Sequence, residues 1–179
     1  MYRLSTGRNI ENPMIKLRGF IASDADLLVA YLNDEQVTNF ITDAIPKPYT
    51  QEDANWWVET HASSAFTKAI EFNGKFVGCI SAIRGEFEYS RGAELGYWIA
   101  REYWNLGIAT EAVRVFGQTL LDSTDIIRLF VSVVSINSAS IRVLEKNGYE
   151  LEGILKSASF KNNRFYDEHL FSKVSQVDE

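Results

Sequence analysis

The chain has 179 residues, of which 46% are hydrophobic, 13% aromatic and 23% charged. This length and composition predict one globular domain over residues 1–179, and they exclude a disordered or fibrous chain. The formal net charge of −6 disfavours nucleic acid as a partner, whereas it suits a cationic substrate.

The N-terminal part predicts a strand followed by a helical arm. Residues 14–18 form the strand, and Ser23 is placed to cap a helix. The apolar residues at helical spacing in that helix are Leu27, Leu28, Tyr31 and Leu32. A short helical stretch follows over residues 35–40, and Thr50 with Asp53 resembles a capping box that begins the next helix.

A hairpin is predicted next, over residues 67–72 and 75–83. The dipeptide Asn73-Gly74 joins its strands, and Asn-Gly supplies the positive φ angles that a two-residue turn requires.

The rest of the chain alternates strands and helices. Strands are predicted over 93–99 and 127–134, helices over 110–121 and from Asn137 or Ser138 to Asn147, and a final hairpin over 150–160 and 165–174, joined through 161–164. Gly148 is expected to end the second helix in a left-handed conformation. This order predicts an α+β fold with a mostly antiparallel sheet and parallel pairing where the two late helices cross over.

Residues 104–111, Trp-Asn-Leu-Gly-Ile-Ala-Thr-Glu, lie between a predicted strand and an amphipathic helix. Gly107 and Ala109 leave the backbone uncovered, so the amides of residues 106–110 can face a ligand at the positive end of the helix. The pattern suits a phosphate group, and it equally suits a turn whose small residues only allow close packing. Neither a G-x-x-x-x-G-K-[ST] loop nor a G-x-G-x-x-G fingerprint occurs, which disfavours ATP and dinucleotides.

A second pattern lies one strand–helix unit later, where Asn137 and Ser140 open a helix and residues 146–149, Lys-Asn-Gly-Tyr, close it. Together with the strand 93–99, Ala-Glu-Leu-Gly-Tyr-Trp-Ile, and the small-residue turn, these residues resemble the GNAT superfamily of acyl-CoA-dependent N-acetyltransferases. The resemblance covers nearly the whole chain. It looks most like the Rim-type branch, which includes ribosomal-protein N-terminal acetyltransferases.

Two residues depart from the family pattern. Trp104 stands where many members have Gln or Arg, which is frequent in the Rim-type branch. Leu144 stands where many members have a general-acid Tyr, so the commonest acid of the family is missing.

The resemblance implies a GNAT-like three-layer fold, with a central mixed, mostly antiparallel sheet, splayed strands and helices on both faces. The splayed strands would be 93–99 and 128–134, with the pantetheine arm of acetyl-CoA between them. That arm would pair with the backbone near Trp98 and Ile99, whose amides could also meet the charge that develops on the thioester oxygen.

The phosphates of acetyl-CoA would contact the start of the first late helix. The resemblance places the pyrophosphate on the amides of Leu106, Gly107, Ile108, Ala109 and Thr110. Asn137 would bind the cofactor arm, cap its own helix, or do both. Arg142 and Lys146, one turn apart, would either reach the 3′-phosphate or form a solvated face.

Glu94 is the candidate base. Acetyl transfer needs a neutral amine, and at pH 7 an α-amine is neutral about 10% of the time and a lysine only about 0.04%. Ala93 and Leu95 alternate to the other sheet face, and the family often places a carboxylate on this strand. Alternatively, Glu94 clamps the ammonium or pairs with a basic residue. Glu102 ranks lower, because its charge would repel the phosphates.

Ser140 is the candidate hydrogen-bond donor to the leaving thiolate, with an ordinary first-turn polar residue as the alternative. A metal is not expected, since His61 and His169 lack ligand spacing. Cys79 is expected to be a buried core residue rather than a nucleophile. The aromatic residues Tyr49, Trp56 and Trp57 would line an acceptor cleft or pack in the core.

Three functions therefore stay open. The first is transfer of the acetyl group of acetyl-CoA to a primary amine, with a protein N-terminus among the acceptors. The others are acetylation of a small polyamine, amino sugar or antibiotic, and acyl-CoA sensing without catalysis. The single cysteine, the polar first 12 residues and the lack of a run of about 20 apolar residues predict a cytoplasmic protein without a membrane segment. The oligomeric state stays open, a homodimer included.

Overall fold

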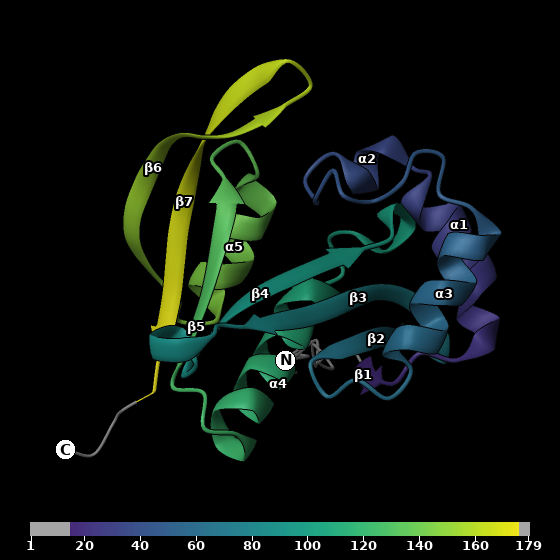
Figure 1. The fold of residues 1–179 in the computed structure, drawn as a ribbon, viewed down its shortest axis with the longest axis horizontal. Coiled ribbons are helices and arrows are strands. Elements are labelled where there is room, and N and C mark those ends of the chain that lie inside the picture. Colours follow the sequence, from purple (N-terminus) through teal and green to yellow (C-terminus); the bar gives the residue numbers. More distant parts are fainter. Residues whose placement is uncertain (1–14, 176–179) are drawn as a thin grey trace, which may run out of the picture.

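Seven strands form one sheet in the computed structural model, which describes residues 15–175 (Figure 1). In chain order they are β1 (Ile15–Arg18), β2 (Thr67–Phe72), β3 (Lys75–Arg84), β4 (Gly92–Ile99), β5 (Arg128–Val134), β6 (Glu150–Lys161) and β7 (Arg164–Val174). Across the sheet the order is β1-β2-β3-β4-β5-β7-β6, and only β4 and β5 pair in parallel. The predicted α+β fold with a mixed, mostly antiparallel sheet is confirmed.

Helices cover both faces of the sheet, as expected for three layers. The helices are α1 (Ala25–Leu32), α2 (Glu35–Thr38), α3 (Gln51–His61), α4 (Ile108–Ser123) and α5 (Ser138–Lys146). One buried cluster joins Val113 of α4 and Leu144 of α5 to Leu129 of the sheet. A second cluster joins Leu28 of α1 to Phe76 on the opposite face. Two cores with the sheet between them therefore support the fold.

The one parallel contact is short. Residues Gly92–Glu94 of β4 pair with Arg128–Phe130 of β5, and the two strands separate beyond that point. This separation confirms the predicted splay. The second crossover, through α5, does not give another parallel pair as expected. Strand β7 lies between β5 and β6, because β5 takes the returning last strand as its antiparallel neighbour.

The predicted helix start at Ser23 is wrong. Residues 22–24 form a 3₁₀ turn, and α1 begins only at Ala25. Arg18 donates two hydrogen bonds to the Asp24 carboxylate, at 2.7 and 2.8 Å. This buried ion pair fixes the turn through Asp24, so the neighbouring serine hydroxyl has no capping role.

The predicted start of α3 and the predicted Asn-Gly hairpin turn are confirmed, unlike the helix start at Ser23. Thr50 and Asp53 form the predicted capping box at the start of α3. Asn73 and Gly74 have φ angles of 49° and 78°, as a two-residue hairpin turn requires. The last hairpin has a tighter loop than expected, because β6 and β7 continue through residues 161 and 164.

Two expectations concern residues outside the described range, namely the strand start at Met14 and the polar character of residues 1–12. Between residues 15 and 175, none of the helices combines the length and the apolar character needed to cross a bilayer.

Candidate functional site

A cavity of about 400 Å³ lies where β4 separates from β5, between the end of β4, the segment around α2 and the first turns of α4 and α5. This volume is within the range of small-molecule sites, roughly 300–1,000 Å³. The predicted site residues in its lining are Trp98, Ile99, Gly107, Ile108, Ala109, Thr110, Asn137, Ser140, Arg142 and Lys146. The structure thus gathers most of the predicted cofactor residues in one place. Leu106, which is 50% exposed, and Glu94 do not line this cavity.

The start of α4 leaves its amides open to the cavity. Gly107 is the N-cap residue, with a left-handed φ of 77°, and no side chain makes a capping hydrogen bond there. Ile108, Ala109 and Thr110 follow it in the cavity wall. The first amides of a helix have no intrahelical acceptor, and together with the helix dipole they attract an anion.

The backbone of β4 is directed alternately to its two sides. The Ala100 amide donates to the Val77 carbonyl of β3 at 2.8 Å. Because backbone groups alternate along an antiparallel strand, Tyr97 and Ile99 direct theirs toward the gap, whereas Trp98 directs its own to β3. Trp98 therefore contributes its side chain to the site. The Trp104 indole donates to the Ile99 carbonyl at 2.7 Å, which leaves the Ile99 amide available.

Asn137 caps α5, because its Oδ1 accepts a hydrogen bond from the Ser140 amide at 3.1 Å. The capping alternative is therefore confirmed. Within residues 15–175, the Asn137 side-chain nitrogen has no hydrogen-bond acceptor, which leaves it a donor for a ligand in the cavity.

The Ser140 hydroxyl has a partner that sequence reasoning missed. The Tyr97 Oη lies 2.8 Å from the Ser140 Oγ, and both residues line the cavity. Burial raises the pKa of Tyr97 to about 12, although the hydrogen bond with Ser140 opposes this shift. The available signal was that Tyr97 is two residues from both Leu95 and Ile99, and therefore lies with these buried residues on the face of β4 that α4 and α5 cover.

Asn147 connects the two helices of the site. Its Nδ2 donates to the Thr110 carbonyl in the first turn of α4 at 3.1 Å and to the Val143 carbonyl at 2.8 Å. Gly148 follows with the predicted left-handed conformation, at a φ of 73°. Leu144 is fully buried, so that position has no donor for the site.

Glu94 is exposed between the buried Ala93 and Leu95, as the predicted alternation requires. Partial burial and the negative charge of Glu168 raise the pKa of Glu94 above its usual range. Glu168 is held in place by Ser132, whose hydroxyl donates to its carboxylate at 2.6 Å. Two acidic groups therefore lie close together near the point where β4 and β5 separate.

The aromatic candidates for an acceptor cleft lie elsewhere. Tyr49 is buried in the core on the α1 side, Trp57 stacks on His61, and Trp56 is 61% exposed. None of the three aromatic residues lines the cavity.

The remaining candidates from the sequence are a cysteine, a second glutamate and a possible metal site. Cys79 is buried, and burial raises its pKa to about 12, so its thiolate is not available as a nucleophile. Glu102 is exposed and accepts a hydrogen bond from the Tyr31 hydroxyl at 3.5 Å. Over the described part of the chain, no three His, Cys, Asp or Glu residues are arranged to hold a metal ion.

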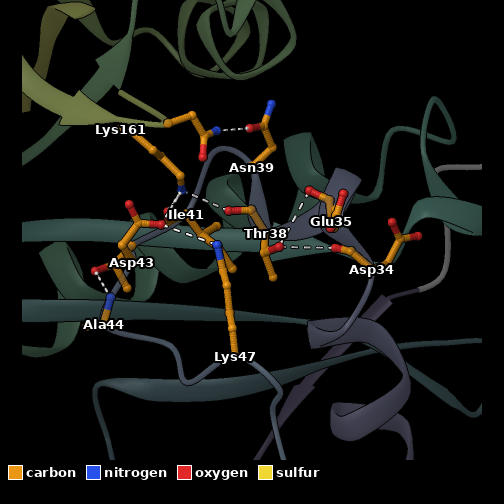
Figure 2. Close-up of polar contacts among 11 residues, drawn as sticks. Asp34, Glu35, Thr38, Asn39, Ile41, Asp43, Ala44, Lys47 and Lys161 are labelled. Atoms are coloured by element: carbon orange, nitrogen blue, oxygen red, sulfur yellow. Dashed lines mark hydrogen bonds and ion pairs between the residues drawn. The ribbon is translucent and has the colours of Figure 1, made fainter. Parts of the chain in front are cut away.

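The tip of the β6–β7 hairpin is bound to the segment after α2 (Figure 2). Lys161 donates to the carbonyls of Thr38 at 3.0 Å and Ile41 at 2.5 Å, and it forms an ion pair with Asp43 at 3.2 Å. Ile41 also lines the cavity. The last hairpin therefore holds one wall of the site, although it is far from that wall in the sequence.

Comparisons with known proteins agree with this geometry. A family model described as "Acetyltransferase (GNAT) domain" matches residues 15–150. The "Uncharacterized N-acetyltransferase YoaA" of Bacillus subtilis (strain 168) is 26% identical over 172 residues, which cover 92% of this chain and 96% of that protein. The "Ribosomal-protein-serine acetyltransferase" of Escherichia coli (strain K12) is 30% identical over 100 residues, which cover 56% of this chain and 55% of that protein.

Solved structures match over most of the chain. A GNAT-family acetyltransferase from Bacillus anthracis has a TM-score of 0.78 at 24% identity, with 89% of this chain and 94% of that chain covered. RimL, a ribosomal L7/L12 alpha-N-protein acetyltransferase in complex with coenzyme A, has a TM-score of 0.79 at 21% identity, with 92% and 96% covered. These likenesses confirm the GNAT fold.

Proposed function

This chain belongs to the acetyltransferase (GNAT) domain family and is an N-acetyltransferase, and from that premise we propose that its acceptor is the α-amine of a protein N-terminus. The observation that carries acetyl transfer is the cavity between the separated strands β4 and β5, which opens onto the uncapped start of α4 and fits acetyl-CoA. Two similar proteins bear names that specify ribosomal proteins as acceptors, which supports the choice of acceptor.

The residues of the cavity fit acetyl-CoA, which supplies an activated thioester when bound. The first amides of α4, after Gly107, would hold the pyrophosphate. Arg142 and Lys146 bring positive charge to the same cavity and would meet the remaining phosphate. The Ile99 amide and the free Asn137 side-chain nitrogen would hold the amide groups of the pantetheine arm.

Glu94 would accept the proton of the attacking amine, directly or through water. The pKa of Glu94 is raised above that of an ordinary glutamate and is therefore closer to the working pH, which suits a general base. An α-amine needs less help than a lysine, because its pKa is about 2.6 units lower. A carboxylate base is therefore better matched to the α-amine of a chain terminus than to a lysine.

Ser140 would donate a hydrogen bond to the sulfur as the carbon–sulfur bond breaks. It lies in the first turn of α5 and lines the cavity. A thiol has a pKa of roughly 8.5, so its thiolate leaves at neutral pH without full protonation. A hydrogen bond from a neutral hydroxyl is sufficient there.

The test mixes the purified protein with acetyl-CoA and a panel of amines, and follows the release of free thiol. The panel contains a peptide with a free N-terminus, the same peptide with a blocked N-terminus and an internal lysine, and the polyamine spermidine. We expect turnover of the first peptide only. Turnover of spermidine alone would overturn the choice of acceptor, and calorimetric binding of coenzyme A without turnover of any amine would favour an acyl-CoA sensor.

A further inference from the structure

We propose that Tyr97 is a positioning residue for acetyl transfer, which holds the Ser140 hydroxyl so that its hydrogen is directed at the leaving sulfur. This inference rests on the proposed function of Ser140 in the same cavity. It adds a second hydroxyl to the site and assigns a role to Tyr97, which lies in the middle of the strand motif 93–99.

The contact joins two elements that the splay of the sheet separates. Tyr97 lies on β4, and Ser140 lies in the first turn of α5, which follows β5. Their hydroxyl oxygens are 2.8 Å apart, the usual distance for a hydrogen bond between two hydroxyls. Both side chains line the cavity, so a group bound there meets the pair rather than an isolated serine.

The direction of the hydrogen bond follows from the chemistry of the two groups. Either hydroxyl can donate to the other, but a phenol is the more acidic donor. When Tyr97 donates to Ser140, the serine hydrogen stays free to point into the cavity. The serine also becomes a better donor, because consecutive hydrogen bonds polarise one another.

Tyr97 acts as a hydrogen-bond donor and not as an acid. Burial raises its pKa to about 12, well above the value of roughly 8.5 for a thiol. A leaving thiolate therefore does not take the phenol proton, and Tyr97 stays neutral throughout.

Acetyl transfer needs no proton from Tyr97. The amine nitrogen bonds to the carbonyl carbon, and the carbon–sulfur bond breaks with its electron pair on sulfur. The amine proton goes to Glu94. The Ser140 hydroxyl stabilises the charge on sulfur, and the free thiolate takes a proton from solvent after release.

The surroundings explain why a second hydroxyl is useful here. Leu144 is fully buried and has no donor, at the position where the sequence resemblance leads one to expect a tyrosine. A lone serine is a weak donor to sulfur. Tyr97 strengthens it from the adjacent strand, so the hydroxyl that is missing from α5 is replaced from β4.

The test measures the acidity of the coenzyme A thiol when it is bound to the protein, by ultraviolet difference spectra of the thiolate across pH. This readout does not require an acceptor. We expect Tyr97→Phe to lower the acid dissociation constant of the bound thiol about threefold to tenfold, the effect of one ordinary hydrogen bond. Ser140→Ala should lower it at least as much, and the double variant no further than Ser140→Ala.

Steady-state kinetics give a second readout once an acceptor is known. Tyr97→Phe should lower kcat about threefold to tenfold while the KM for acetyl-CoA stays within twofold. Tyr149→Phe is the matched control, because the Tyr149 hydroxyl is buried with no partner among the described residues and lies outside the cavity lining. It should leave both measurements unchanged.

Two results would overturn the inference. One is a bound thiol as acidic in Tyr97→Phe as in the wild type. The other is an equal effect of Tyr97→Phe with and without Ser140, which would show that tyrosine does not act through serine. A wild-type protein that binds no coenzyme A would overturn the proposed function itself.

Discussion

The Lys161 ammonium lies 3.2 Å from the Asp43 carboxylate, and this pair joins the tip of the last hairpin to the segment after α2. Lys161 ends β6, in the half of the sheet that β5, β7 and β6 form, whereas Asp43 lies in the segment that connects β1 to β2 of the other half. The two halves separate beyond the short β4–β5 contact. In Figure 1 the β6–β7 hairpin leans toward α2 above this gap. Lys161 therefore connects the two halves of the sheet across the gap between β4 and β5.

Lys161→Met should lower the free energy of unfolding by about 2 kcal/mol, because the Lys161 side chain is only 13% exposed and the variant loses its hydrogen bonds to two carbonyls and its ion pair. Urea unfolding measures this. The matched control is Lys156→Met on the same hairpin, where a 76%-exposed lysine pairs with Asp167 and the loss should be below about 1 kcal/mol. Equal losses in the two variants would contradict the role of Lys161 as a bridge.

Glu94→Gln should lower kcat about 100-fold at pH 7, at the lower end of the effect of removing a general base. It should also raise the melting temperature slightly at that pH. A carboxyl whose pKa is raised by folding stabilises the protein at low pH, and this contribution is lost as the pH rises through the raised pKa. Full activity of the variant from pH 6 to 9 would show that Glu94 is not the base.

Glu168→Gln should shift the acidic limb of kcat/KM to lower pH. The neighbouring negative charge helps to raise the pKa of Glu94, so its removal makes Glu94 a stronger acid. The glutamine oxygen can still accept the hydrogen bond from Ser132. Glu59→Gln on α3 changes the net charge equally and should leave the pH profile in place. A shift of the same size in both variants would mean that net charge alone is responsible.

Gly107→Ala should weaken coenzyme A binding about tenfold and destabilise the protein by about 1 kcal/mol, because its φ of 77° disfavours a side chain at the start of α4. Calorimetry measures the first effect. Gly74→Ala has the same backbone strain, at a φ of 78°, in a hairpin turn with open space around it. It should lose similar stability and keep full affinity. Equal losses of affinity would exclude a specific role for the α4 start.

Asn137→Ala should lower the free energy of unfolding by about 1 kcal/mol, the usual value for an N-cap. Asn137→Asp retains the acceptor oxygen and should restore stability. Because aspartate has no amide donor, coenzyme A should still bind this variant more weakly than the wild type. Wild-type affinity in Asn137→Asp would limit Asn137 to its capping role.

Local signals predicted the elements where one residue type decides the backbone. Asn73-Gly74 set a hairpin turn, and Gly148 ended α5, since few residues adopt positive φ angles easily. The helix start at Ser23 failed for the opposite reason. The partner that decides it, Arg18, acts on Asp24 through an ion pair between two elements, and no local pattern shows such a pair.

The site follows the same division. Gly107 and Asn137 could be found from the sequence, because each precedes a helix, where a glycine leaves the amides uncovered and an asparagine is a favoured N-cap. Tyr97 could not, because its role depends on a hydroxyl 43 residues away across the splay. Lys161 is likewise 123 residues from Thr38, and only the folded chain brings them together.

The gap between β4 and β5 leaves part of the β4 edge without a neighbouring strand, so a bound ligand can complete the sheet there. Tyr97 and Ile99 direct their backbone groups to a side of β4 where β5 is no longer paired. A molecule that has amide groups of its own and lies along that edge would form hydrogen bonds with the β4 backbone, as a neighbouring strand does. Occupancy and folding stability would then rise together, and the protein would be most robust to heat and proteolysis while its substrate is in place.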